Sequence, residues 1–264
     1  MSDTYDAGNV MPAMREILEG VAAGDLSPAQ AEAALRGYVM GDAGRFDAAR
    51  EHRRGVPEAI LAEGKTVEEV TEMMHMAVDS TGRAIITRLD DGSLEAVLPV
   101  ARELGTTTVE HRSGGIVVHT PSFDPPEVDA VVGIATGGTG DAGVAAEASM
   151  ICEEMGPRTE LFHDVGVASI DRVLDVADRL RAMDAMIVCA GREGALPTVV
   201  AGLVDVPVIG VPVAGGYGHA DGGEAALAGL LQSCTVLTVV NIDAGFVAGA
   251  QAGLIARAIA GGRA

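Results

Sequence analysis

Residues 129–141, DAVVGIATGGTGD, decide the predicted fold, because a short apolar run there ends directly in a glycine-rich turn. Four further apolar runs of strand length lie at residues 159–165, 184–190, 207–213 and 236–242. Each run is followed by a segment whose apolar residues recur at helical spacing. Continuously apolar runs, unlike alternating ones, are typical of strands covered on both faces. Five such units predict an α/β fold with a doubly wound parallel sheet over residues 125–264.

The chain before this sheet has a different pattern. Helical spacing and charged, turn-rich segments come first, and short β-like runs (AIIT, TTVEH and GIVVHT) then flank a helical segment at residues 94–105. Thr66 and Glu69 have the spacing of a capping box and predict the start of one helix. The stretch Pro121–Pro126 is the best candidate for a linker. We therefore expect a partly helical, small α/β N-terminal region over residues 1–124.

Composition and charge exclude several classes of protein. The chain has 264 residues, of which 48% are hydrophobic and 3% aromatic, and its formal net charge is −20. This apolar content excludes global disorder, while an acidic surface with few aromatic side chains disfavours binding to nucleic acid or to anionic membranes. The sequence has no apolar run of about eighteen residues, and Met1–Asp6 does not resemble a secretory signal, so we expect a cytoplasmic protein.

The three cysteines are an odd number at no metal-ligand spacing, which predicts reduced thiols. Cys152 falls within a helical segment and Cys189 within an apolar strand, where packing is expected. Cys234 lies between a helix and the last strand. By its position alone it is either a buried structural cysteine or a reactive one.

Only one of the 18 basic residues is a lysine, Lys65. An acidic chain almost free of lysine is typical of a protein adapted to concentrated salt, so Lys65 is either a chance survivor on a solvated loop or retained for a specific purpose. Arg50, Arg53 and Arg54 share a turn-rich stretch with it. Together these cations form either an anion site or a solvated face.

Ligands of doubly wound sheets bind at the carboxyl ends of the strands, so the loops there are the candidate site. The loop GGTGD at 137–141 either holds a phosphate on the N–H groups of Gly137, Gly138 and Gly140, or is an ordinary glycine turn. It matches neither the P-loop nor the dinucleotide fingerprint. Asp141 is more often a helix cap than a catalyst, and Glu193 is either functional or a first-turn residue favoured by the helix dipole.

Seven separated motifs together resemble one family. In chain order they are DAAREHRRGVPEAILAEGKT, ATGGTGDAGVAAEA, FHDVGVAS, AGREGALPTVVAGLVDVPVIGVPV, GGYG, SC and VVNIDAGF. From about Arg45 to its C-terminus the chain is similar to the LarB family, the pyridinium-3,5-biscarboxylic acid mononucleotide synthases of nickel-pincer cofactor biosynthesis. Its C-terminal half is also similar to the aminoimidazole ribonucleotide (AIR) carboxylases of purine synthesis, and GTGD resembles their Ser-Asp phosphate loop.

The resemblance implies carboxylation of the pyridinium ring of nicotinic acid adenine dinucleotide, with carbon dioxide or bicarbonate as co-substrate, and hydrolysis of its phosphoanhydride to release AMP. It makes Cys234 the expected nucleophile, and Glu193 the expected residue for proton transfer or ring orientation. Mg²⁺ is expected to bridge the diphosphate, whose charge Arg50, Arg53 and Lys65 would offset. Its metal ligands are unknown. The other implied substrate-binding residues are Gly138, Thr139, Asp141, Arg172, Gly216, Tyr217, Asn241 and Asp243.

The family, and a last helix that is apolar nearly all round, also imply a homo-oligomer, with an octamer favoured. Three positions depart from the family pattern: Ser169–Arg172 stands where Gly-x-His-Arg is usual, Ala244 stands where Asn is expected, and VPVAGGYG replaces a more polar segment. The alternatives are an AIR carboxylase of purine synthesis, whose His-containing loop is absent, and a non-catalytic nucleotide-binding protein. Retention of Cys234 and Glu193 argues against the second.

Overall fold

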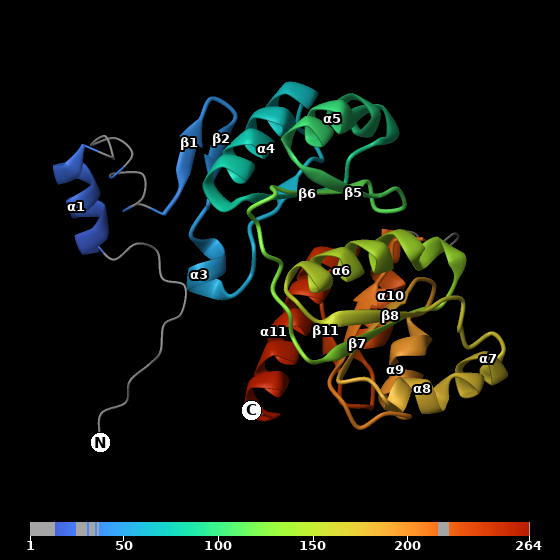
Figure 1. Ribbon diagram of the computed structural model, residues 1–264. Coiled ribbons are helices and arrows are strands. Elements are labelled where there is room, and N and C mark those ends of the chain that lie inside the picture. The colour runs from blue at the N-terminus through green and yellow to red at the C-terminus, as the bar shows by residue number, and fades with distance from the viewer. Residues whose placement is uncertain (1–13, 25–30, 32–34, 36, 216–221, 264) are drawn as a thin grey trace, which may run out of the picture. The chain divides into compact units, whose positions relative to one another are not determined.

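The computed structural model describes residues 14–24, 31, 35, 37–215 and 222–263 (Figure 1). Its Cα positions group into two units. The first comprises the chain up to Val109 together with Ile116–Phe123, and the second comprises Glu110–Gly115 together with Asp124–Ala264. Among the described residues, no helix is long and apolar enough to cross a membrane.

The first unit contains a four-stranded sheet with the strand order β3-β4-β6-β5 and a separate hairpin, β1-β2. Its strands are β1 Val39–Gly41, β2 Gly44–Phe46, β3 Ile60–Leu61, β4 Arg83–Thr87, β5 Thr106–Glu110 and β6 Gly115–His119. Its helices are α1 Met14–Ala23, α3 Arg50–Arg54, α4 Val67–Thr81 and α5 Asp91–Leu104. The capping box predicted for α4 is present: Thr66 Oγ1 accepts from Glu69 N–H, and Thr66 N–H donates to the Glu69 carboxylate.

The core of this unit packs α4 and α5 against the sheet. Met74 and Ala77 of α4, Val97 of α5 and Ile86 of β4 are completely buried. Because an amphipathic helix buries one face, the spacing of these residues explains why α4 and α5 form where the sequence predicts helices.

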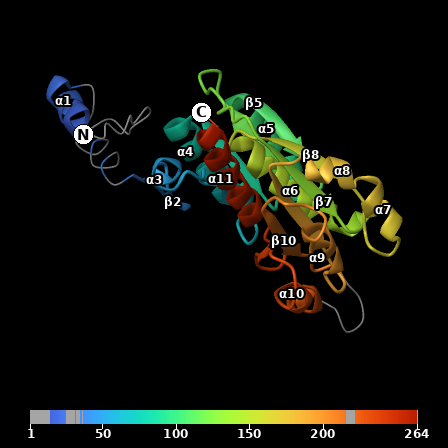
Figure 2. The same ribbon diagram turned by 90° about the horizontal axis from the view of Figure 1, so that it is seen from below.

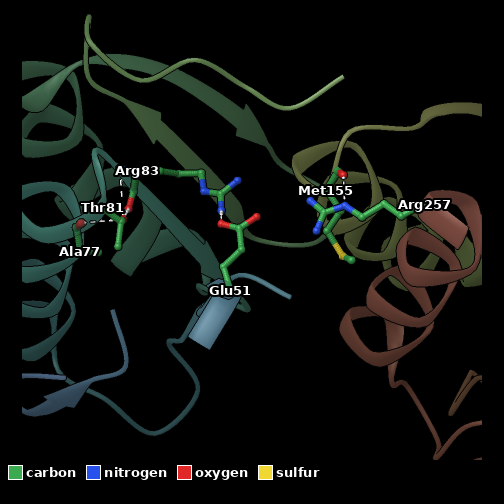
Figure 3. A network of polar contacts seen from close by, with 6 residues as sticks. All are labelled: Glu51, Ala77, Thr81, Arg83, Met155 and Arg257. Atoms are coloured by element: carbon green, nitrogen blue, oxygen red, sulfur yellow. Dashed lines mark hydrogen bonds and ion pairs between the residues drawn. The ribbon is translucent and has the colours of Figure 1, made fainter. Parts of the chain in front are cut away.

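One charged side chain interrupts this apolar interior. Arg83, at the start of β4, is only 4% exposed. Its guanidinium donates to the Glu51 carboxylate of α3 (Figure 3). It also lies 4.9 Å from the centre of the Phe123 ring. The ion pair therefore ties α3 to the sheet, as a buried charge requires a partner.

The second unit contains a five-stranded sheet in which every neighbouring pair is parallel, in the order β11-β10-β9-β7-β8. Its strands are β7 Val131–Thr136, β8 Arg158–Phe162, β9 Ala185–Ala190, β10 Val208–Pro212 and β11 Thr238–Val239. Its helices are η1 Thr139–Asp141, α6 Ala142–Glu154, α7 Ile170–Asp175, α8 Ala177–Arg181, α9 Ala195–Ala201, α10 Glu224–Leu231 and α11 Gly245–Arg263. The predicted doubly wound α/β fold is confirmed.

Helices cover both faces of this sheet. Alanines of α6 and α11 pack with Ile134, Ile187 and Ile209 on one face. Residues of α7, α8 and α9 pack with Met186 and Val188 on the other. Adjacent strand residues thus point into different cores, which is why the strands read as continuously apolar in the sequence.

The two helices on the first face, α6 and α11, lie side by side (Figure 2). A Cβ atom on Gly249 would lie 2.3 Å from Ala148 O, so only glycine permits this approach of the two backbones. Further along α11, Arg257 Nε donates to Met155 O over 2.8 Å (Figure 3). The last helix is therefore fixed to α6 at several points along its length.

Candidate active site at the carboxyl ends of the parallel strands

The strand order defines where a ligand is expected. From β7 the chain adds β8 on one side, and then β9, β10 and β11 in order on the other side. The strand order therefore reverses between the neighbouring strands β7 and β9. Doubly wound sheets bind ligands at this switch point, outside the carboxyl ends of the strands. Residues 137–141 follow β7 and residues 191–194 follow β9. These are the two loops that the sequence singles out.

Asp141 connects these two loops. One of its carboxylate oxygens accepts from Gly138 N–H over 2.8 Å, and the other accepts from Gly191 N–H over 3.2 Å. The side chain makes no capping bond to α6, but its bond to Gly138 N–H is a capping contact at the start of η1. Asp141 also joins the loop after β7 to the loop after β9.

The environment of Asp141 raises its pKa above the ordinary 3.8. Burial is the main cause, since the residue is 6% exposed, and the negative charge of Asp243 adds to it. The two backbone N–H bonds act in the opposite direction. Asp243 in turn accepts from Ala214 N–H over 2.9 Å, which joins the loop after β11 to the loop after β10.

Two N–H donors of the glycine loop already have acceptors, one on β9 and one within the loop. Gly137 N–H donates to Cys189 O over 3.0 Å, and Gly138 N–H donates to Asp141. In this loop, Thr139 N–H and Gly140 N–H remain at the start of η1, where helix N–H groups lack intrahelical partners. A Cβ atom on Gly140 would meet no atom within 4 Å, so there is space beside this end of the loop.

The loop after β8 packs directly on the glycine loop. Asp164 N–H donates to Thr136 Oγ1 over 3.0 Å, and a Cβ atom on Gly166 would lie only 2.2 Å from Gly137 O. Arg172, a predicted substrate-binding residue, pairs with Asp164 over 3.1 Å on an exposed surface. It stands beside the predicted site and already has an acidic partner.

The loop after β9 carries Glu193, which is exposed. Its neighbour Arg192 adopts a left-handed backbone conformation with φ of 53°, and Gly194 follows with φ of 67°. Two close approaches fix this loop to α10. Cβ atoms would clash at Gly194 with Ala226 O and at Gly229 with Glu193 O. The backbone of Glu193 is thus held by α10 while its side chain reaches solvent.

Of the three cysteines, Cys234 alone is exposed. Burial raises the pKa of Cys152 to about 12, and it raises that of Cys189 as well, with further contributions from the charges of Asp141 and Asp243. These two thiols stay protonated and unreactive near neutral pH. Cys234 precedes β11, on the side where that strand begins, whereas Asp141, Glu193 and Asp243 follow their strands.

The residues beside Cys234 form a cycle of hydroxyl groups with α9. Thr198 Oγ1 donates to Ser233 Oγ over 2.9 Å, and Ser233 Oγ lies 2.8 Å from Thr235 Oγ1. Thr235 N–H also donates to Ser233 Oγ over 3.2 Å, and Thr235 Oγ1 makes a longer contact of 3.5 Å with Thr198 O. Ser233 and Thr235 are half-buried, so the turn is anchored while Cys234 between them faces solvent.

Three of the four cations predicted in the first unit have a partner within that unit. Arg50 pairs with Glu58, and Arg53 makes a two-pronged contact with Asp47. Lys65 Nζ donates to Leu61 O over 2.6 Å. The structure therefore does not present these three residues as one cluster of unpaired positive charge.

Three predicted substrate-binding residues remain, and the structure describes one of them, Asn241. Gly216 and Tyr217 fall outside the described residues. Asn241 is exposed after β11, and its Oδ1 accepts from Ile242 N–H. Among the described residues, no group of three or more His, Cys, Asp or Glu side chains could hold a metal ion by itself.

Sequence reasoning missed Glu147. This α6 residue is 3% exposed, and its Oε2 accepts from Phe246 N–H at the start of α11 over 3.0 Å. A negative charge is favourable there, because the N-terminal end of a helix carries partial positive charge. A signal was present: Glu147 is the lone charge within AGVAAEASMIC, an otherwise small and apolar stretch. Thr198 and Ser233 were also missed as a pair, since 35 positions separate them.

Two family models match the chain. A LarB/PurE-like N-terminal domain matches residues 39–118, and an AIR carboxylase matches residues 131–264. An uncharacterized protein of Methanocaldococcus jannaschii is 36% identical over 220 residues, which are 81% of this chain and 84% of that relative. The second match spans all five parallel strands and the loops described above.

Proposed function

Because the chain belongs to the LarB family and carries a carboxylase-type domain like that of the AIR carboxylases, we propose that it carboxylates the pyridinium ring of nicotinic acid adenine dinucleotide and hydrolyses the phosphoanhydride. The products are a pyridinium-3,5-biscarboxylic acid mononucleotide and AMP. The observation that carries the proposal is the exposed Cys234, held on an anchored turn within the carboxylase-type domain.

The chemistry requires a nucleophile such as this thiol. A pyridinium ring is electron-poor and does not attack carbon dioxide. Addition of the Cys234 thiolate to a ring carbon gives a dienamine, whose ring carbon then forms a bond to carbon dioxide. Loss of the ring proton to a base and expulsion of the thiolate restore the aromatic ring. Water then cleaves the phosphoanhydride bond.

Other residues have complementary roles in this proposal. Glu193, exposed in the loop after β9, accepts the ring proton or orients the ring. The N–H groups of Thr139 and Gly140 bind a phosphate oxygen at the start of η1. Asp141 and Asp243 hold the surrounding loops together through backbone N–H groups.

Mg²⁺, which neutralises charge on the diphosphate when bound, is compatible with these residues. Mg²⁺ keeps several water ligands and is commonly held by substrate phosphates with one or two carboxylates, so a protein-only cluster is unnecessary. Asp141 and Asp243 are the carboxylates that would hold it at this edge of the sheet.

The test is incubation with nicotinic acid adenine dinucleotide, isotope-labelled bicarbonate and Mg²⁺ in molar salt, followed by mass spectrometry. We expect a labelled mononucleotide with one added carboxyl group, and AMP. A parallel reaction with aminoimidazole ribonucleotide tests the purine-pathway alternative. Binding of the dinucleotide without any product would contradict the proposal and favour a non-catalytic nucleotide-binding protein.

The matched activity test uses the cysteines. Cys234→Ser should abolish carboxylation, because a hydroxyl at neutral pH does not replace a thiolate. Cys152→Ser and Cys189→Ser should retain activity, since both thiols are buried in the packing of the second unit. Full activity of the Cys234 variant would exclude the covalent mechanism.

We also propose a homo-oligomer, with an octamer favoured. A groove of about 830 Å³ runs beside the edge strand β11 and the outer face of α11. Its lining includes Val236, which is 96% exposed, Val247, which is 51% exposed, and Ile255. Contiguous apolar surface of this kind is typical of interfaces. Light scattering in molar salt should show a particle several times the 26.8 kDa of one chain, and a monomer would contradict the proposal.

A further inference from the structure

The turn that carries Cys234 is held to the helix that follows Glu193, and the contact is made by hydroxyl groups. Thr198 lies one helical turn after the start of α9, and Glu193 lies two residues before that helix. Thr198 Oγ1 donates to Ser233 Oγ, the side chain immediately before Cys234. One short helix therefore connects the proposed nucleophile to the proposed proton acceptor.

We propose that Thr198 is a positioning residue for Cys234, an inference that rests on the proposed function. The three hydroxyl groups of this cycle can each donate to the next member. Thr198 O–H donates to Ser233, Ser233 O–H can then donate to Thr235 Oγ1, and Thr235 O–H makes the long contact to Thr198 O. Hydrogen bonds arranged in such a chain polarise one another, so removal of one member weakens the others.

Packing restricts the conformations that the turn carrying Cys234 can adopt. α10, which ends three residues before Cys234, is locked to the loop of Glu193 at Gly194 and Gly229. The chain between the end of α10 and the start of β11 contains only six residues, 232–237, so its freedom is restrained at both ends. Among the described residues of this segment, Ser233 and Thr235 alone make side-chain hydrogen bonds to α9. Orientation of Cys234 thus depends on the Thr198 contact.

The test compares three threonine variants. Thr198→Val keeps the shape of the side chain and removes the hydroxyl, while Thr198→Ser keeps the hydroxyl. The matched control is Thr238→Val, because Thr238 lies only four residues after Cys234 and its Oγ1 donates one hydrogen bond outside the cycle, to Val208 O. All three are purified as the full chain and compared with the wild type.

Two measurements are made on each variant. Steady-state turnover of nicotinic acid adenine dinucleotide is the first. We expect Thr198→Val to lower kcat by about fivefold or more with KM unchanged, the size of effect expected when one net hydrogen bond that positions the thiol is removed. Hydrogen exchange of the Thr235 amide is the second, and it should become faster in Thr198→Val, because that N–H donates to Ser233 Oγ. Thr198→Ser and Thr238→Val should resemble the wild type in both.

The outcomes separate the inference from the proposed function. Absence of turnover by the wild type would refute the proposed function and with it the catalytic meaning of the inference, while the exchange measurement would still decide whether Thr198 holds the turn. Unchanged kcat and unchanged exchange in Thr198→Val would overturn the inference. So would an equal loss of kcat in Thr238→Val, or failure of Thr198→Ser to restore activity, since either would indicate a general effect on folding.

Discussion

Replacing Asp141 by Asn tests whether this side chain joins two loops of the site. The carboxylate accepts Gly138 N–H with one oxygen and Gly191 N–H with the other. An asparagine has one oxygen and one NH₂ group, so it can accept only one of these donors and presents a donor to the other. Asp141→Asn therefore keeps the size of the side chain and breaks one of the two connections.

The expected loss of stability follows from burial. An unsatisfied buried donor costs about 1–3 kcal/mol, and removal of a buried charge offsets part of this at neutral pH. We therefore expect a net destabilisation of about 1–2 kcal/mol, or a fall in melting temperature of about 2–8 °C for a unit of this size. Asp178→Asn is the matched control, because the Asp178 side chain is completely exposed and its loss should leave stability unchanged.

The measurements are chemical denaturation in molar salt and hydrogen exchange of the loop after β9. If the side chain of the Asp141→Asn variant keeps its bond to Gly138 N–H, it loses the bond to Gly191 N–H, and that amide should exchange faster. A variant as stable as the wild type, with unchanged protection of Gly191, would refute the assignment of Asp141 as a connection between the loops.

The pH dependence has a definite sign. The pKa of Asp141 in the folded chain lies above 3.8. At pH values between 3.8 and this folded pKa, the folded chain therefore binds more protons than the unfolded chain. The contribution of Asp141 to stability is therefore complete below pH 3.8 and decreases as the pH rises through the folded pKa. The difference in stability between wild type and Asp141→Asn isolates this contribution from the other carboxylates, and an increase of that difference with rising pH would contradict a raised pKa.

Three further predictions concern other parts of the chain. A thiol reagent at pH 8 should label Cys234 alone in the native protein and all three cysteines after denaturation, as counted by mass spectrometry; rapid labelling of two would contradict the burial described here. Gly245→Ala should destabilise the chain by about 1–3 kcal/mol, because its Cβ would lie 2.5 Å from Val144 O and 2.7 Å from Glu147 Oε2, whereas Gly261→Ala, with no atom within 4 Å, should not. Lys65→Arg should lower turnover without changing the melting temperature, and equal turnover would show that its identity is unimportant.

The architecture of the second unit was predictable because parallel strands leave a strong local signal. β7, β9 and β10 are buried on both faces, so each is almost continuously apolar; glycine follows β7 and β9, and β10 ends at proline. Burial of Cys189 was predictable for the same reason, and burial of Cys152 was predictable because it lies in a helical segment of mostly small and apolar residues. Strand β11 is shorter than its apolar run predicts, because only Thr238 and Val239 pair with β10 at the edge of the sheet.

Contacts between residues that only folding brings together were harder to predict from the sequence. Arg50 and Arg53 suggest free positive charge in the sequence, yet folding brings Glu58 and Asp47 against them. Nothing in a single sequence specifies which carboxylate meets which guanidinium, because such pairs depend on turns whose geometry is set by the whole unit. In a chain with a net charge of −20, acidic partners are abundant, so the expectation for any arginine is that it is paired.

The same excess of acid makes the few buried carboxylates informative. Acidic side chains are almost never buried without partners, because removing a charge from water is costly. In the described part of the second unit, Asp141 and Glu147 are nevertheless 6% and 3% exposed, and both accept backbone N–H groups at the ends of elements that border the site. Their position has a physical explanation. Loops at the carboxyl ends of parallel strands expose backbone donors, and a carboxylate satisfies two of them while fixing their relative placement. We therefore expect buried acids, rather than the abundant exposed ones, to determine the geometry of the site.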